Sequence, residues 1–258
     1  MKKKQKLVIV LIWIVMLIFF AWTRYWYCDM KQDIIDYISQ QTIIREIEQE
    51  PEYITVFVER EANSDKYVEL RLGVDNIEQN PELPTGCEVT SLTIVLNYLG
   101  YDVDKLILAD LFLPKGEIGE THPDEAFIGN PRDKSSYGAN APVLVTTAND
   151  YLAKTEGEHT AYDITGTEFP ELIKYINDGY PVMVWETMHM LESYPSTKWK
   201  LDSGEYQWYA RFHCMVLIGY TNDKYIMADP LKNGITYYDK DIVEQRYNEL
   251  GQQAIVIY

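Results

Sequence analysis

The segment from Leu7 to Thr23 constrains this chain most, because its seventeen residues are uncharged and almost wholly apolar. At about 1.5 Å per residue, a helix of that length is roughly 25 Å long, at the short end for a bilayer span. Four lysines precede the segment, and three aromatic residues, Tyr25, Trp26 and Tyr27, follow it where an interfacial belt would lie. We therefore expect an N-terminal transmembrane helix with its basic side in the cytoplasm and the remaining chain facing outward.

A cleaved signal peptide is the alternative for this segment. The apolar region of such a peptide is usually about 7–15 residues long and ends in a small-x-small site. The exit from Phe20 to Arg24 contains no such site, and the aromatic residues before Cys28 argue against a lipoprotein signal. The sequence therefore favours an uncleaved signal-anchor over residues 7–23, preceded by a cytoplasmic basic tip at residues 1–6.

Charge and composition exclude several classes of protein. The chain has 258 residues and a net charge of −17, which divides into +4 on residues 1–30 and −21 on the rest. Sequence-nonspecific nucleic-acid binding depends on Lys and Arg that neutralise phosphates, so we expect no nucleic-acid partner. A content of 47% apolar residues is enough to bury a core. Three cysteines cannot form a disulfide scaffold, although Cys28 at the outer membrane boundary could bridge two chains.

The pattern after the anchor predicts an α+β protein. Residues 24–75 are expected to form a juxtamembrane helix or linker and two short strands, at 53–58 and 67–72, and residues 76–258 one domain. Residues 114–142 are rich in Gly, Pro and charge, which is typical of a lid or binding loop. Helices are expected to come first and an antiparallel sheet to follow. The expected helices are 86–99, 104–112, 147–154 and 167–177, and the expected strands are 181–187, 206–220, 224–229, 234–238 and 253–258.

The helix that begins at Gly86 has the sharpest pattern in the chain. Apolar residues recur at helical spacing up to Leu99, and Thr85 with Glu88 forms a capping-box pattern. Cys87 then lies in the first turn, where unpaired N–H groups and the helix dipole favour a negative charge. A nucleophilic thiol needs a lowered pKa, so this position makes Cys87 the candidate nucleophile.

His213 is the candidate base, because it lies in the apolar run from Phe212 to Tyr220 and needs a partner there. A core histidine without catalytic function is the alternative. Asp229 follows a turn at 221–224, and a three-residue loop would set it opposite Leu217, on the face of His213; an even loop would place it on the other face. By alternation Cys214 points away from His213 and is expected to be an inert core thiol.

These residues carry a resemblance to a known family. The stretch from Gln79 to Leu92, the run from His213 to Tyr220, and Ala228-Asp229-Pro230 resemble cysteine peptidase family 39, the bacteriocin leader peptidase-like domains, in their stand-alone branch. The resemblance covers residues 77 to 258 and implies a papain-like fold, with helices packed on an antiparallel sheet. It implies Cys87 as nucleophile, His213 as general base and acid, Asp229 as the residue that orients the imidazole, and Gln79 as an oxyanion-hole residue.

The chain departs from the transporter-fused members of that family. Those members cleave leader peptides on the cytoplasmic side, whereas this sequence has no GxxxxGK[ST] motif and one expected span. The resemblance therefore implies thiol acyl-transfer chemistry but not the substrate. No CxxC, HExxH or paired-His spacing supports zinc, and Asp239, Asp241 and Glu244 are expected to form a solvated face. We expect neither a metal nor a cofactor.

The leading hypothesis is a membrane-anchored, outward-facing thiol peptidase or amide hydrolase with a peptide or protein substrate. One alternative is a noncatalytic peptide- or cell-wall-binding module on the same fold, and another is a thiol acyltransferase. Aromatic residues before His213 are expected either to line a peptide groove or to pack in the core. They are Trp199, Tyr206, Trp208 and Tyr209.

Overall fold

The computed structural model describes residues 53–58 and 67–258 of the chain. The predicted basic tip, signal-anchor and juxtamembrane helix, together with Cys28, lie outside these residues. Within the described ranges, no helix is both long enough and apolar enough to cross a membrane.

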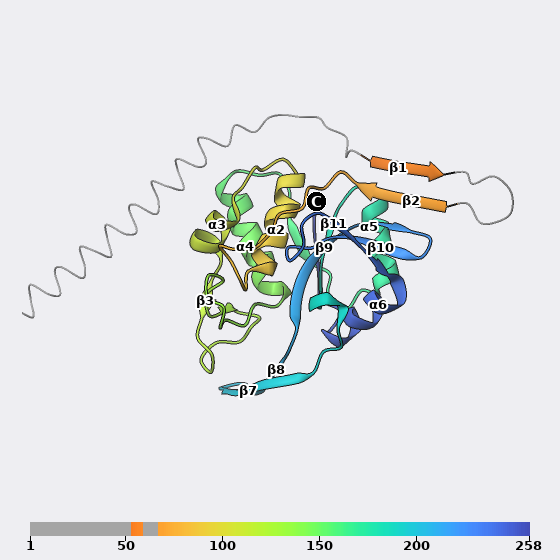
Figure 1. Ribbon diagram of the computed structural model, residues 1–258. Coiled ribbons are helices and arrows are strands. Elements are labelled where there is room, and N and C mark those ends of the chain that lie inside the picture. Colours follow the sequence, from red (N-terminus) through yellow and green to blue (C-terminus); the bar gives the residue numbers. More distant parts are fainter. Residues whose placement is uncertain (1–52, 59–66) are drawn as a thin grey trace, which may run out of the picture. The chain divides into compact units, whose positions relative to one another are not determined.

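The described residues form an eight-stranded sheet in which every pairing is antiparallel (Figure 1). Its order is β1-β2-β9-β6-β12-β5, and β10 joins β9 to β11. The central strand is β9, which pairs with β2, β6 and β10. The strands are β1 (Tyr53–Val58), β2 (Tyr67–Leu72), β5 (Ala161–Asp163), β6 (Val182–Thr187), β9 (Phe212–Thr221), β10 (Lys224–Ala228), β11 (Ile235–Asp239) and β12 (Ala254–Ile257).

Helices cover both faces of this sheet, which explains why its inner strands are apolar without alternation. Trp185 and Glu186 are neighbours on β6 and therefore point to opposite faces. Trp185 Nε1 donates to Ala139 O at 3.0 Å, beside the start of α4. On the other face, the positive charge of Arg246 on α6 acts to lower the pKa of Glu186, against the larger raising effect of burial. The long helices are α2 (Cys87–Tyr98), α4 (Ala141–Lys154) and α6 (Lys240–Glu249), and the short ones are α3 (Lys105–Ile107), η1 (Leu108–Phe112), η2 (Phe169–Leu172), α5 (Ile173–Asn177) and η3 (Met188–Met190).

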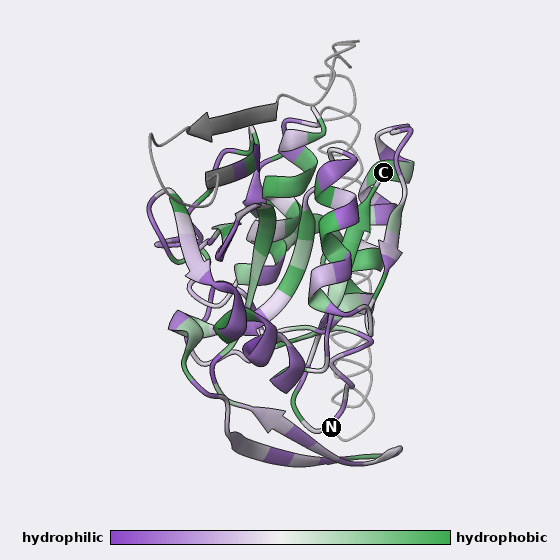
Figure 2. Cartoon of the chain, turned by 90° about the vertical axis from the view of Figure 1, so that its right-hand side faces the viewer, coloured by the Kyte–Doolittle hydropathy of each residue, from purple (hydrophilic) through white to green (hydrophobic). Residues whose placement is uncertain are grey.

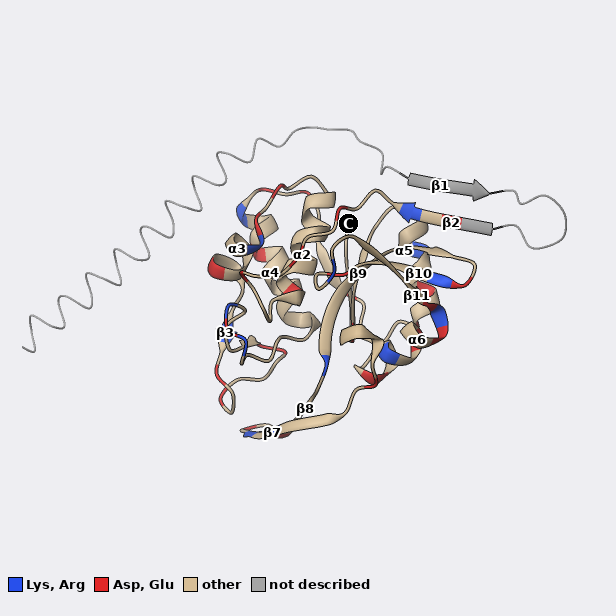
Figure 3. Cartoon of the chain, in the orientation of Figure 1, with Lys and Arg blue, Asp and Glu red and all other residues tan. Residues whose placement is uncertain are grey.

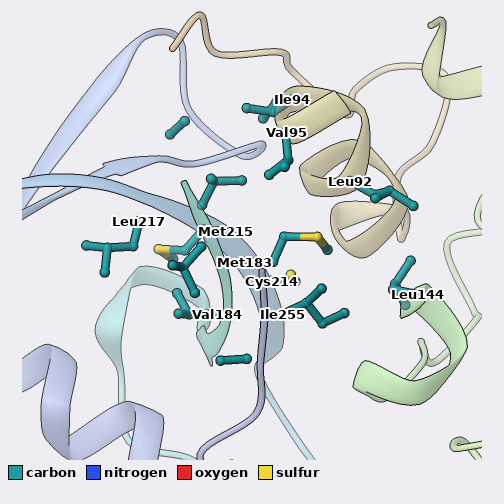
Figure 4. Close-up of a cluster of buried hydrophobic side chains, with 14 of the residues drawn as sticks. Leu92, Ile94, Val95, Leu144, Met183, Val184, Cys214, Met215, Leu217 and Ile255 are labelled. Atoms are coloured by element: carbon teal, nitrogen blue, oxygen red, sulfur yellow. The ribbon is translucent and has the colours of Figure 1, made fainter. Parts of the chain in front are cut away.

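The core lies between the helices and the sheet. Figure 2 shows apolar residues on the inner strands and on the helix faces turned toward them. Figure 4 shows one part of this core, in which side chains from α2, α4, β6, β9 and β12 meet. Among those labelled are Leu92, Val95, Leu144, Met183, Cys214, Met215 and Ile255, all at most 1% exposed.

The predicted mixed class of helices and an antiparallel sheet is confirmed, and so are both short strands before residue 76. The expected strand 206–220 is wrong, because the chain turns at Ala210 and Arg211. Arg211 has a φ of 64°, which ends one strand before β9 begins. Aromatic and apolar residues continue on both sides of this turn, from Trp208 and Tyr209 to Phe212, so periodicity could not locate it. The residues before the turn form a hairpin of β7 (Pro195–Leu201) and β8 (Gly204–Tyr209).

The pattern also missed α6, since seven of its ten residues are charged or carry an amide. Val243 and Tyr247 are fully buried at a spacing of four, and they hold the helix on the sheet. The acidic residues predicted as a solvated face make ordinary contacts here: Asp239 pairs with Lys224, and Glu244 accepts a hydrogen bond from the Tyr225 hydroxyl at 2.8 Å.

The segment 114–142 is mainly loop, with one short parallel pair of β3 (Lys115–Gly116) and β4 (Phe127–Ile128). Figure 3 shows acidic residues along this loop and few charges on the central strands. Its C-terminal part leads directly into α4 and contacts the start of α2, where Thr85 Oγ1 donates to Asp133 O and the Ala139 N–H donates to Glu88 Oε1.

Candidate active site

The start of α2 is held by tight packing and not by a side-chain cap. Gly86 is the N-cap residue, and a Cβ there would lie 2.7 Å from Leu83 Cβ. The predicted capping box is wrong, because Thr85 Oγ1 donates to Asp133 O at 2.9 Å and Glu88 bonds elsewhere. Cys87 is nevertheless the first residue of the helix, so its predicted position in the first turn is confirmed although the capping box used to locate it does not form.

Hydrogen bonds from one backbone N–H and one side-chain amide join the segment before Cys87 to the segment around Asp229. The Gln79 N–H donates to Pro230 O at 2.9 Å. Asn76 Nδ2 donates to Asp229 O at 3.1 Å and to Lys232 O at 2.6 Å. Segments about 150 residues apart in sequence thus meet, and the structure brings the predicted site residues Gln79 and Asp229 into one region.

His213 and Asp229 form a buried pair, which the hairpin pattern had left open and the family resemblance implied. His213 Nε2 lies 2.7 Å from Asp229 Oδ1, and both side chains are 1% exposed. The loop between β9 and β10 has two residues, not three, because Thr221 is the last residue of β9 and Lys224 the first of β10.

A β-bulge in this hairpin restores the register. The pairing shifts by one residue between Ile226 and Met227, so that Ala228 lies opposite Val216. Asp229, one position further on, therefore falls opposite Met215 and not Leu217. Residues 213 and 215 share a face, so the bulge puts Asp229 on the face of His213.

The Asp229 carboxylate accepts three hydrogen bonds from the described residues, the first from His213. Leu231 N–H donates to Oδ1 at 2.9 Å, and the Tyr238 hydroxyl donates to Oδ2 at 3.0 Å. Burial alone would raise the pKa of Asp229, but the hydrogen bond and charge of His213, with these two further donors, hold it below the ordinary value. The carboxylate is therefore ionised at neutral pH and fixes the orientation of the imidazole, with Nδ1 on the opposite side of the ring.

The Cys87 thiol is 6% exposed and donates a hydrogen bond to Glu88 Oε2 at 3.2 Å. Burial raises its pKa well above the ordinary value, and the negative charge of Glu88 and the nearby Cys214 raise it further. This direction is opposite to the lowering expected from the helix N-terminus. The reason is that desolvation and an adjacent carboxylate outweigh the dipole of one helix turn.

Glu88 is the functional candidate that the sequence reasoning missed. Its side chain is 0% exposed, and Oε1 accepts a hydrogen bond from Ala139 N–H at 2.9 Å. Burial raises its pKa to about 7, against the lowering effect of that N–H, of Cys87 and of His213. A signal was present: every residue of α2 from Cys87 to Leu96 is buried, and a carboxyl in such a helix needs a specific partner.

Gln79 lies beside the helix start, but its amide donors face its own turn. Nε2 donates to Leu83 O at 3.2 Å and to Pro84 O at 3.0 Å, and Oε1 has no hydrogen-bond partner within the part of the chain described. Exchanging the two amide atoms would set Oε1 against two carbonyl oxygens, so the network fixes this orientation. The amide would have to turn before it could donate to an oxyanion.

Three of the aromatic residues considered for a groove pack in a small core. Trp199 and Trp208 are at most 8% exposed and cluster with Ile128, while Tyr206 packs against them. Tyr209 is 42% exposed.

This cluster reaches the site through Gly138. A Cβ at that position would lie 3.4 Å from both Trp208 and Phe212 and would overlap Glu88 Oε1. The prediction of core packing is therefore confirmed for three of the four residues. Their cluster lies next to Gly138, beside the hydrogen bond between the Ala139 N–H and Glu88 Oε1.

Comparisons with known proteins show the family to which the chain belongs. Residues 71–255 match the model of the Peptidase_C39 like family. Protein YvpB of Bacillus subtilis (strain 168) is 31% identical over 185 residues, which are 69% of this chain and 70% of that protein. A crystal structure from Bacillus anthracis, described as a C39-like peptidase, matches with a TM-score of 0.65 and 33% identity, over 72% of this chain and 94% of that one. The chain therefore belongs to the Peptidase_C39 like family and has the papain-like cysteine peptidase domain of that family.

Proposed function

We propose that this chain is a cysteine peptidase in which Cys87 is the nucleophile and His213 and Asp229 supply the acid–base chemistry. The observation that carries the proposal is the buried His213–Asp229 pair, hydrogen-bonded through its neighbouring residues to the segment that leads into Cys87. A buried imidazole with one nitrogen fixed by a carboxylate is the arrangement that general acid–base catalysis requires.

The chemistry follows from the groups present. The Cys87 S–H bond breaks, its proton passes to His213 Nδ1, and Sγ attacks the carbonyl carbon of the scissile amide. The Asp229 carboxylate stabilises the imidazolium. His213 then returns the proton to the leaving amine, and an acyl group remains on sulfur as a thioester. Water, deprotonated by His213, hydrolyses that thioester and regenerates the thiol.

Charge develops on the carbonyl oxygen during the attack. The N–H of the first residue of a helix has no partner within the helix, so the Cys87 N–H is a candidate donor for this oxyanion. Gln79 is the candidate second donor, and it requires the amide rotation described above. Loss of one such donor typically costs about 3–4 kcal/mol of transition-state stabilisation.

We also propose that the enzyme is anchored in the cell membrane through residues 7–23 with its peptidase domain outside the cell. The support is the uncharged apolar segment, the lysines before it and the aromatic residues after it. Full-length protein should remain in the membrane fraction with its first residues intact. Recovery of a soluble form trimmed after about residue 20 would refute the anchor.

The peptidase activity is tested by profiling the full-length chain on a peptide library that includes cell-wall stem peptides. We expect new peptide termini with the wild type and with Cys214→Ala, and none with Cys87→Ala or His213→Ala. An amine acceptor added to the same reactions separates hydrolysis from acyl transfer. Cleavage by Cys87→Ala at the wild-type rate would refute the proposal, and peptide binding without any thioester would favour a noncatalytic binding module.

A further inference from the structure

The Cys87 thiol has a carboxylate as its hydrogen-bond acceptor. Its S–H donates to Glu88 Oε2 at 3.2 Å, whereas His213 makes its close contact with Asp229 through Nε2. A negative charge beside a thiol favours the neutral S–H form over the thiolate. In the form that the structure describes, the sulfur is therefore held in its unreactive state.

The Glu88 carboxyl is held by a cradle formed by Gly138 and Ala139. It is 0% exposed, and the Ala139 N–H fixes Oε1 at 2.9 Å. Gly138 has a φ of 144°, and a Cβ there would overlap Oε1, so the backbone is shaped around the carboxyl group. Trp208 and Phe212 would each lie 3.4 Å from the same Cβ position. This is a function for the loop 114–142, whose end supplies both residues of the cradle.

Three other titratable groups in the described part of the chain interact with the Glu88 carboxyl. Cys87 lies on its own helix, the charge of His213 on β9 lowers the pKa of Glu88, and the charge of Glu88 raises the pKa of Cys214 on the same strand. Glu186 of β6 acts on Cys214 and points to the α6 side. The loop contributes the Ala139 N–H. His213 is the cation that would oppose the charge of Glu88.

We propose that Glu88 is a built-in restraint on the nucleophile: its carboxylate keeps the Cys87 thiol protonated, and thiolate forms readily only when the charge at Glu88 is neutralised. The inference rests on the proposed role of Cys87 as nucleophile. A proton bound by Glu88, or the imidazolium of His213 approaching the pair, neutralises that charge. The restraint protects a buried thiol from oxidation and alkylation, because the thiolate is the reactive form in both reactions.

The test measures the alkylation rate of Cys87 by iodoacetamide in the full-length chain between pH 5.5 and pH 9, with the modified residue located by mass spectrometry. Glu88→Gln keeps the size of the side chain and an acceptor for the Ala139 N–H but removes the charge. Below pH 6 Glu88 is protonated in the wild type, so the two proteins should react at equal rates. Above the Glu88 pKa of about 7, the variant should become faster.

The ratio of variant to wild-type rate should reach at least about tenfold by pH 8.5, which corresponds to a thiol pKa lowered by about one unit. In the wild type, the alkylation rate of Cys87 should rise less steeply with pH above pH 7 than below it. This expectation can be checked on the wild-type protein alone. A ratio that stays constant across the pH range would show a merely structural effect of Glu88, and a ratio below one would show that Glu88 promotes thiolate formation; either result overturns the proposal.

Glu186→Gln is the matched control. It removes a carboxyl that is also 0% exposed but makes no contact with Cys87 among those the structure gives, and burial raises the pKa of Glu186 well above its usual range. Its rate ratio should therefore stay near one throughout. Alkylation needs no peptide substrate, so this test fails or succeeds independently of the hydrolysis assay for the proposed function.

Discussion

Replacement of Asp229 separates the orienting function of its oxygen atoms from that of its charge. The carboxylate is 1% exposed and accepts hydrogen bonds from His213 Nε2, the Leu231 N–H and the Tyr238 hydroxyl. Asp229→Ala removes the acceptor of all three donors and leaves a cavity. Asp229→Asn keeps Oδ1 for the first two, and its new NH₂ group can donate to the Tyr238 hydroxyl, which rotates to accept it.

The two variants should therefore differ in stability. A buried donor left without a partner costs about 1–3 kcal/mol, so with two or three such donors Asp229→Ala should lower the free energy of unfolding by about 3–6 kcal/mol. Asp229→Asn loses only the charge-assisted part of its hydrogen bonds, about 1–2 kcal/mol. Peptidase activity should fall strongly in the alanine variant and less in the asparagine variant, because only the latter still orients the imidazole.

The stability difference should also depend on pH. Since the pKa of Asp229 is lower in the folded than in the unfolded state, its charge stabilises the fold above about pH 4, and this contribution is lost as the pH falls through the folded-state pKa. Urea unfolding followed by far-ultraviolet circular dichroism measures both variants. The reasoning is refuted if alanine is no more destabilising than asparagine at pH 7, or if the deficit of asparagine does not shrink on acidification.

Two further predictions concern the Glu88 cradle. Because the pKa of Glu88 is raised from 4.5 to about 7, the contribution of its protonated form to the free energy of unfolding is complete below pH 4.5. About 3 kcal/mol of that free energy should be lost as the pH rises from there through 7. Glu88→Gln should abolish this loss in urea unfolding, and a pH profile unchanged in the variant would contradict the prediction. Gly138→Ala should lower the free energy of unfolding by about 2–3 kcal/mol, against about 1 kcal/mol for Gly119→Ala, which also has a positive φ but open space around it. Equal melting temperatures for the two glycine variants would show that Gly138 does not shape the cradle.

Local pattern predicted the parts of the site that depend on one helix or one strand. The spacing of apolar residues and the capping-box pattern together placed Cys87 in the first turn of α2, although the capping box does not form, and the apolar run placed His213 on a buried strand. The pairing of His213 with Asp229 could only be left open, because it depends on the parity of a hairpin. The structure resolves that parity with a two-residue loop and a bulge, and a bulge has no fixed sequence signature.

The state of the nucleophile could not be predicted from the helix alone. Glu88 fits a capping pattern with Thr85. In the structure, however, the Thr85 hydroxyl donates to Asp133 O, and the Glu88 carboxyl accepts a hydrogen bond from the Ala139 N–H. These partners lie about fifty residues away in sequence, so tertiary packing overrides the local motif. The same cause hid α6, since the mainly polar sequence of that helix forms a buried face only where Tyr247 meets the rest of the core.

The central claim, that Cys87 is the nucleophile of a thiol peptidase, is tested most directly by covalent labelling with a thiol-directed peptide electrophile. The wild-type chain, Cys87→Ala and Cys214→Ala are labelled in parallel, and the modified residue is located by mass spectrometry. Cys214 is fully buried, and burial raises the pKa of its thiol, so it should not react. We expect one label on Cys87 in the wild type and in Cys214→Ala, and none in Cys87→Ala; equal labelling of Cys87→Ala would contradict the assignment.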